Sequence, residues 1–412
     1  MAPSCAGTQV AQKESGGFNL TSCIYFCLVL FWMLLPSGTA PPLIALVLVG
    51  ICWLVTGQKA DYKSALRPWF WPVIALLCLS VAGLWHSLDR ELGMDYALKG
   101  KYWILAPIFT GLCLKERRVF HMVAALWAGL GIGVVLAVGQ RLGWLPPNSN
   151  GYMGYGVAYT FCAPYLVFGM LMAGFYYQRT QRRLYRMGLI FLIAAFIGHL
   201  SLLHGRIGYL LILITVPMIV NQLANKMSRG IKLVICIAVI AGLCLSPAVQ
   251  SRMRFTFGVL KTNKERLLKC EDVADAPRLW IYSQAIKAFN QSPVFGIGTG
   301  SFTEFTRPTG HTVTHPHNNL LYMLMSYGVP GGLVFFWLFG TLFYIAWPRR
   351  HTELGYFVLS VGWIIFVAGM FDTSLLNSQT LIMFSVTYGF LYPLQKMPKG
   401  RAVLKKEELV EA

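Results

Sequence analysis

The sequence is dominated by long apolar stretches separated by short polar segments. A helix needs about 20 mostly apolar residues to cross the hydrocarbon core, where its own backbone must satisfy its hydrogen bonds. Such stretches occupy residues 20–35, 40–56, 68–85, 98–114, 119–140, 155–177, 185–203, 206–222, 231–248, 318–346, 354–371 and 375–394. The pattern predicts an all-α integral membrane protein with about twelve transmembrane helices.

The composition excludes several other classes of protein. Only 12% of the residues are charged, about half the share that soluble domains carry, which excludes a soluble enzyme and a disordered chain. Most of the ten cysteines lie in or beside apolar stretches, and they show neither a disulfide framework nor zinc-ligand spacing. The net charge of +19 comes from short basic clusters, not from a continuous face for nucleic acid.

These basic clusters also predict the orientation in the membrane. The connections between the apolar stretches alternate between two sets, one for each side of the membrane. Most lysines and arginines fall in one set, and the short loops of the other set hold only Arg90, Arg141 and Arg206. Positively charged loops stay on the cytoplasmic side. Both termini are therefore expected in the cytoplasm.

One connection on the outer side is much longer than the rest. The predicted organisation is nine transmembrane helices over residues 1–248, a loop domain over 249–317, three transmembrane helices over 318–394 and a cytoplasmic tail over 395–412. Within the loop, Asp275 and Pro277 are helix start signals, and apolar residues share one face of a helix predicted over 277–290.

Two glycine clusters flank the end of this loop. Gly296, Gly298 and Gly300 lack the strand and lysine of a nucleotide-binding loop, and a tight turn back to the membrane is the preferred interpretation. The cluster of Gly328 to Gly332 around Pro330 predicts a kink in the tenth apolar stretch.

Three histidines, His311, His315 and His317, directly precede the tenth stretch at the outer interface. A neutral imidazole there can accept a proton from a hydroxyl group. Helix-capping residues and a metal site formed by the trio remain as alternatives. Asp372 lies at the outer end of the last two stretches, where it either orients a histidine or belongs to a plain polar turn.

Arginines form the second candidate group. Arg206 opens the eighth stretch, and Arg278 lies at the start of the loop helix. Guanidinium groups suit phosphate oxygens, so the pair suggests a lipid-linked phosphate or diphosphate. Snorkelling to the interface and surface exposure are the competing explanations. Weaker candidates on the same side are Arg252, Arg254, Lys99 and Lys101.

The order of these motifs is similar to that of a known family. After Arg206 come Arg278-Leu279-Trp280, a Pro293-x-x-Gly-x-Gly turn, and His317-Asn318 followed nine residues later by Gly328-x-x-Gly331. This order resembles the O-antigen ligase family of lipopolysaccharide biosynthesis, which is related to the O-antigen polymerases and bacterial O-oligosaccharyltransferases. The chain departs from the family's Ser-Arg-Gly pattern by having Gly205 and Ile207 around Arg206.

The resemblance implies a GT-C-like glycosyltransferase of the bacterial inner membrane, with its active site facing the periplasm. It would transfer a glycan from undecaprenyl diphosphate to a hydroxyl of the lipid A–core oligosaccharide, surrounded by membrane lipids and without cofactor, metal or nucleic acid. His317 would be the general base, and Arg206 and Arg278 would bind the diphosphate. The supporting residues would be His315, His311, Asn318, Arg252, Arg254, Lys99, Lys101 and Asp372.

Three alternatives remain open. An O-antigen polymerase uses the same donor chemistry but tends to have two large periplasmic loops, whereas a protein O-oligosaccharyltransferase usually has a longer C-terminal part. A secondary transporter is a different class, and it would show inverted repeats and charged or broken helices near the midplane. No internal repeat is found here, and the notable cations gather at one face.

Overall fold

The computed structural model describes residues 20–56, 67–110, 116–146, 148, 154–203, 206–245, 250 and 277–398. All regular elements in these ranges are helices. Four of the described helices are long and apolar enough to cross a membrane, and five shorter apolar helices accompany them. The protein is therefore a helical, multi-pass membrane protein.

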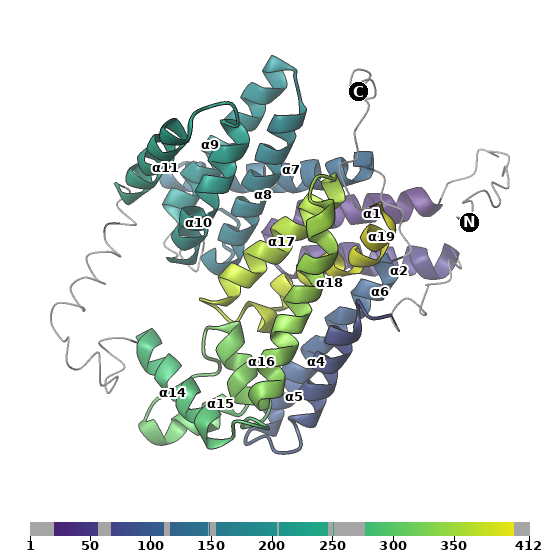
Figure 1. Cartoon of the computed structure of the whole chain (residues 1–412), viewed down its shortest axis with the longest axis vertical. Coiled ribbons are helices and arrows are strands. Elements are labelled where there is room, and N and C mark those ends of the chain that lie inside the picture. Colours follow the sequence, from purple (N-terminus) through teal and green to yellow (C-terminus); the bar gives the residue numbers. More distant parts are fainter. Residues whose placement is uncertain are drawn as a thin grey trace.

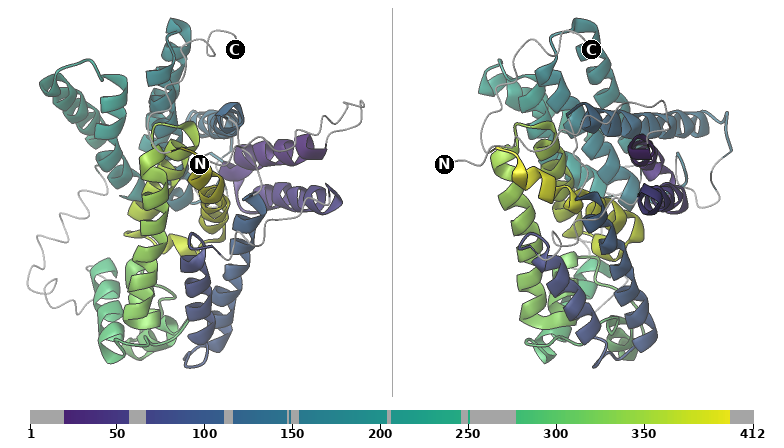
Figure 2. Two further views of the ribbon diagram at one scale, coloured as in Figure 1. Left: turned by 45° about the vertical axis from the view of Figure 1, so that its right-hand side comes forward. Right: turned by 90° about the vertical axis from the view of Figure 1, so that its right-hand side faces the viewer.

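The first half of the chain builds two helical groups (Figure 1). Helices α1 (Leu20–Leu34) and α2 (Ala40–Thr56) run side by side and project away from the rest (Figure 2). The second group contains α7 (Glu116–Arg141), α8 (Tyr159–Arg179), α9 (Arg183–Leu202), α10 (Arg206–Leu223) and α11 (Arg229–Cys244). Edge-to-face contacts of Phe357 with Trp32 and Phe168 join both groups to the C-terminal helices.

The C-terminal helices form the centre of the molecule. They are α16 (Asn319–Ala346), α17 (Glu353–Gly369), α18 (Ser378–Gly389) and α19 (Leu391–Lys396), and they pack against α4 (Trp71–Ala82) and α6 (Leu105–Phe109). The aromatic core between them includes Trp103 in edge-to-face contact with Phe384 and Tyr388.

At one end of the molecule, α14 (Pro277–Gln291) and α15 (Phe302–Thr306) lie beside α16, with α5 (Arg90–Leu98) nearby (Figure 1). The helix predicted over 277–290 is thus confirmed. The apolar face is predicted from Ile281, Ala285 and Phe289, and Ile281 and Ala285 are indeed buried, whereas Phe289 is only half-buried. The buried face extends instead to Trp280, Gln284 and Ala288.

Two predicted spans are wrong as continuous helices. Residues 98–114 form a 3₁₀ helix (Lys99–Ile104) followed by the short α6, and residues 375–394 divide between α18 and α19. Each break precedes a proline, Pro107 or Pro393. Proline cannot donate to the carbonyl four residues earlier and its ring collides with that carbonyl, so a long helix cannot continue through it.

The glycine cluster in α16 makes a sharp bend rather than a mild kink. Gly328 has φ 66° and ψ −156°, and a Cβ atom on Gly331 would lie 2.1 Å from the carbonyl oxygen of Met323. Residues eight apart in a straight helix are about 12 Å apart along its axis, so the two segments fold back onto each other. The tenth predicted span is therefore two packed segments, and the longer one begins after Gly328.

The glycine turn of the loop fills this bend. The N–H groups of Ile297 and Gly298 donate to the carbonyl oxygens of Met325 and Ser326, and Val329 donates to Pro293. These bonds satisfy backbone groups that the helix loses at its break. The turn predicted at Gly296 and Gly298 is confirmed, and it anchors the loop domain to α16.

Candidate functional site

The candidate site is built where α16 begins. The Asn318 side chain caps the helix by accepting a hydrogen bond from the N–H of Leu321, and its amide also donates to the carbonyl of Met370. The next residue, Asn319, donates to the Ser374 hydroxyl. The cap by Asn318 is usual for asparagine at an N-cap. Through their other bonds, these two amides clamp the segment between α17 and α18 onto the start of α16.

The clamp brings a carboxylate to the third histidine. Nδ1 of His317 lies 3.2 Å from Oδ1 of Asp372. His317 has φ 51°, the only positive φ outside glycine among the described residues, and such a conformation is uncommon for a side-chain-bearing residue. The side chains of His317 and Asp372 are 38% and 17% exposed, so the ring is held by its partner and remains accessible.

The electrostatics of this pair favour an ionised Asp372. Burial raises the pKa of its carboxyl, but the hydrogen bond and charge of His317 and the N–H of Thr373 outweigh burial, so the pKa falls below its usual value. With Nδ1 directed at a carboxylate, Nε2 of His317 is the nitrogen left to act on a substrate.

His315 lies directly against His317. Their ring centroids are 4.4 Å apart, and Nδ1 of His315 lies 3.1 Å from the hydroxyl oxygen of Thr373. Burial lowers the pKa of His315 to about 4, and the neighbouring His317 adds to the fall. His315 is therefore neutral at physiological pH and contributes hydrogen bonds rather than charge.

The loop helix α14 reaches the same place through Tyr282. Its hydroxyl lies 3.5 Å from the carbonyl oxygen of His317 and also bonds to the Asn318 side chain. Arg278 lies one turn earlier on α14 and is half-buried. Burial raises the pKa of Tyr282, and the positive charge of Arg278 acts in the opposite direction.

The segment between α4 and α6 contributes a second cation. Lys99 pairs with Asp95 at 3.4 Å and lies 4.8 Å from the ring centroid of Tyr96, whose hydroxyl donates to the carbonyl of Thr314. The charge of Lys99 also contributes to the low pKa of His315. Lys99 is therefore part of the surroundings of the histidines.

The other predicted residues have separate places. Lys101 lies over the ring of Tyr102, and the exposed His311 makes an edge-to-face contact with Trp280. Arg206 is the first residue of α10, as predicted, but its side chain lies outside the described part of the structure. Arg252 and Arg254 also lie outside the described residues.

Three groups of the site have a geometry that can bind a metal ion. The ligand atoms of His315, His317 and Asp372 all lie within 4.8 Å of one another. Two imidazoles and a carboxylate form a set that zinc and non-haem iron accept. The donor set fits a metal, so the metal-free prediction stays a prediction.

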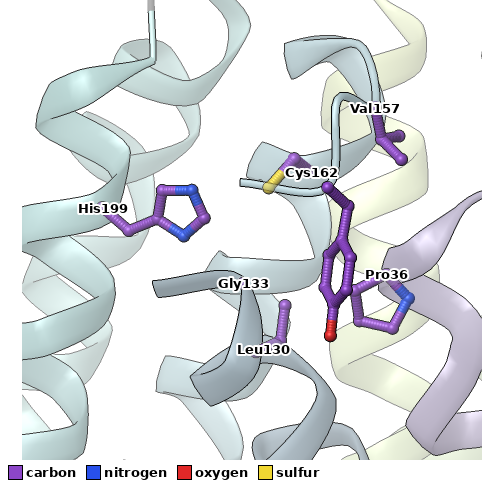
Figure 3. Close-up of a pocket in the computed structure, with 7 residues that line it drawn as sticks. Pro36, Leu130, Gly133, Val157, Cys162 and His199 are labelled. Atoms are coloured by element: carbon purple, nitrogen blue, oxygen red, sulfur yellow. The ribbon is translucent and has the colours of Figure 1, made fainter. Parts of the chain in front are cut away.

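A second cavity lies away from this cluster, lined by the turn after α1, the middle of α7, the start of α8 and the end of α9 (Figure 3). His199 and Cys162 point into it, and neither ring nitrogen of His199 has a hydrogen-bond partner among the described residues. None of the predicted site residues lines this cavity.

The sequence of this part of the chain was compared with models of known protein families. Residues 191–336 match the O-antigen ligase family model, Wzy_C. The predicted resemblance is confirmed over this segment, which is similar to membrane glycosyltransferases of the ligase and polymerase type. The matched segment includes Arg206, Arg278, His317 and Asn318, whereas Asp372 and Lys99 lie outside it. No curated protein matches the chain.

Several residues of the site were missed in the sequence. Tyr282 follows Arg278 by four residues, a spacing that places both on one helix face, and this signal was available. Thr373 and Asn319 gave no comparable signal, because their roles depend on the contact between α16 and the segment after α17.

Proposed function

We propose that the protein transfers an O-antigen glycan from undecaprenyl diphosphate to a hydroxyl of the lipid A–core oligosaccharide, on the periplasmic face of the bacterial inner membrane. The observation that carries this proposal is the contact between His317 and Asp372 at the start of α16. The match over residues 191–336 supports the donor class.

His317 acts as the general base. Its Nδ1–H donates to Asp372, and Nε2 accepts the proton of the acceptor hydroxyl as the oxygen attacks the anomeric carbon. The bond between that carbon and the diphosphate oxygen breaks, and the electron pair leaves with the diphosphate. A positioned base of this kind contributes roughly 10²- to 10⁴-fold to the rate.

Arg278 and Arg206 bind the diphosphate. Negative charge grows on the leaving group in the transition state, and preorganised cations stabilise it best in a site that excludes water. The half-buried position of Arg278 and its electrostatic effect on Tyr282 support this role. Lys99 adds positive charge beside His315.

The direct test is a reconstituted transfer assay with undecaprenyl-diphosphate glycan and acceptor lipopolysaccharide. We expect His317→Ala to lower kcat by about 10²- to 10⁴-fold and His86→Ala, at an exposed histidine, to keep wild-type activity. Arg278→Ala is expected to raise the donor KM, with Arg141→Ala at an exposed arginine as control. An active His317→Ala enzyme would exclude the general-base role.

A metal-assisted transferase is the second candidate, because the ligand atoms of His315, His317 and Asp372 cluster so closely. In that case the three side chains would hold a metal ion that acts as a Lewis acid, and His317 would be a metal ligand rather than the general base. Dialysis of the wild-type enzyme against a chelator distinguishes the two. The proposal expects full activity in chelator, and activity that is lost and then restored by Zn²⁺ or Mn²⁺ would support the metal.

A further inference from the structure

A polar groove lies on the loop domain, apart from the histidines. It is lined by α14 on one side and by α15 and the turn that follows it on the other, and it contains about 920 Å³ of space open to solvent. Its lining residues are Gln284, Lys287, Asn290, Gln291, Phe305, Pro308 and Thr309.

One lining residue indicates that the groove binds a ligand. Gln284 is only 6% exposed, yet its side chain lines the groove. Its amide does not belong to the fully buried, unpartnered polar groups of the described residues. An amide held in the wall of a groove in this way can exchange a hydrogen bond to water for one to a hydroxyl group of a ligand.

The remaining lining has a mixed chemistry. Asn290 and Gln291 offer both donors and acceptors, and Lys287 offers donors. Phe305 and Pro308 add flat apolar surfaces, and none of the described residues that line the groove is acidic. Sugar rings present hydroxyl groups along their edges and C–H groups on their faces, so this combination matches a carbohydrate chain.

Both walls of the groove lead to the candidate site. The α14 wall continues toward Tyr282 and Arg278, and the other wall continues through Gly310 to the histidines. Trp280 and His311, one from each wall, are in contact between the groove and the site. At 1.5 Å per residue, Asn290 lies about 18 Å along α14 from Arg278, which is farther than a single reacting sugar extends.

We propose that this groove binds the glycan chain of a substrate several sugar residues away from the reacting bond. The proposal rests on the proposed transferase function for the identity of the glycan, which belongs either to the donor or to the acceptor core. In both cases the Gln284 amide and the Phe305 ring hold the glycan chain. They raise its affinity without touching the reacting atoms.

Binding can be tested separately from catalysis. The probes are the O-polysaccharide and the core oligosaccharide released from the bacterium's lipopolysaccharide by mild acid, measured against the full-length protein in nanodiscs by ligand-observed NMR. We expect one of the two to bind wild type. Asn290 is exposed and lines the groove, so a tryptophan there would fill it. We therefore expect Asn290→Trp to abolish binding. Ile286→Trp is the matched control, since Ile286 is 48% exposed on the same helix and does not line the groove.

A second variant tests the amide of Gln284. Gln284→Leu keeps most of the side-chain volume and is expected to weaken binding by roughly 2- to 10-fold, as the loss of one hydrogen bond predicts. In the transfer assay, Asn290→Trp should raise the KM for the bound glycan and leave kcat unchanged. A rise in donor KM identifies the donor chain, and a rise in acceptor KM identifies the core.

The proposal is overturned if neither released glycan binds wild type, or if Asn290→Trp binds as well as Ile286→Trp. Failure of the transferase proposal would look different. Wild type would then bind a released glycan through the groove but transfer nothing in the reconstituted assay.

Discussion

At the scale of single residues, the site depends on how each histidine is held. His315 is half-buried against His317, and its pKa falls to about 4 because partial burial disfavours the charged ring. A free histidine has a pKa near 6.5. Between pH 4 and 6.5 the unfolded chain therefore binds a proton that the folded protein does not.

This difference predicts that the free energy of unfolding depends on pH. It is highest above pH 6.5 and declines as the pH falls toward 4, by an amount on the order of 2–3 kcal/mol. We expect His315→Gln to flatten this decline in apparent melting temperature, measured with chelator present. The exposed His311→Gln should keep the wild-type slope, and an unchanged slope in His315→Gln would exclude His315 as its source.

Asp372 is predicted to act only through His317, as a positioning residue. Asp372→Asn removes the charge that orients the ring, and we expect kcat to fall by at least about 10-fold, because the orienting carboxylate selects the productive tautomer. The double variant with His317→Ala should be no slower than His317→Ala alone. Additive losses would show that Asp372 has an independent role, and Glu91→Gln, at an exposed carboxylate, serves as the control.

At the scale of elements, the bend of α16 determines where the site can form. Gly328 was predicted from the sequence as a kink because glycine and proline clusters interrupt helices. The fold-back itself could not be predicted, since it depends on hydrogen bonds that the N–H groups of Ile297 and Gly298 donate and on the carbonyl of Pro293, which accepts from Val329. These residues lie about 30 positions earlier in the chain. Local pattern locates the break, and only tertiary contacts decide its angle.

The bend makes a specific stability prediction. A Cβ atom on Gly328 would lie 2.3 Å from the carbonyl oxygen of Val294, and its φ of 66° disfavours any other residue. We expect Gly328→Ala to lower stability by roughly 2–4 kcal/mol, measured as the apparent melting temperature in detergent. Gly340→Ala is the matched control on the same element, where a Cβ would meet nothing within 4 Å. Equal stability of the two variants would contradict the bend.

At the scale of the whole molecule, sequence reasoning was strongest for helix positions and weakest for their geometry. Nine of the predicted stretches overlap a single described helix, and the tenth overlaps the bent α16, because apolar length is a local property. The breaks before Pro107 and Pro393 were missed, although each proline was visible. The contact of His317 with Asp372 could only be suggested, because 55 residues separate them.

The predicted orientation is a separate claim, since it rests on charge distribution alone. A single cysteine introduced at the exposed Ile286 of α14 should react with a membrane-impermeant maleimide in intact spheroplasts. One at the exposed Arg183, at the start of α9, should react only after lysis. Labelling is compared with the parent protein, whose native cysteines set the background. His317 and α14 adjoin each other, so the reverse labelling pattern would put the histidine site on the cytoplasmic side. That result would contradict a transfer reaction on the periplasmic face.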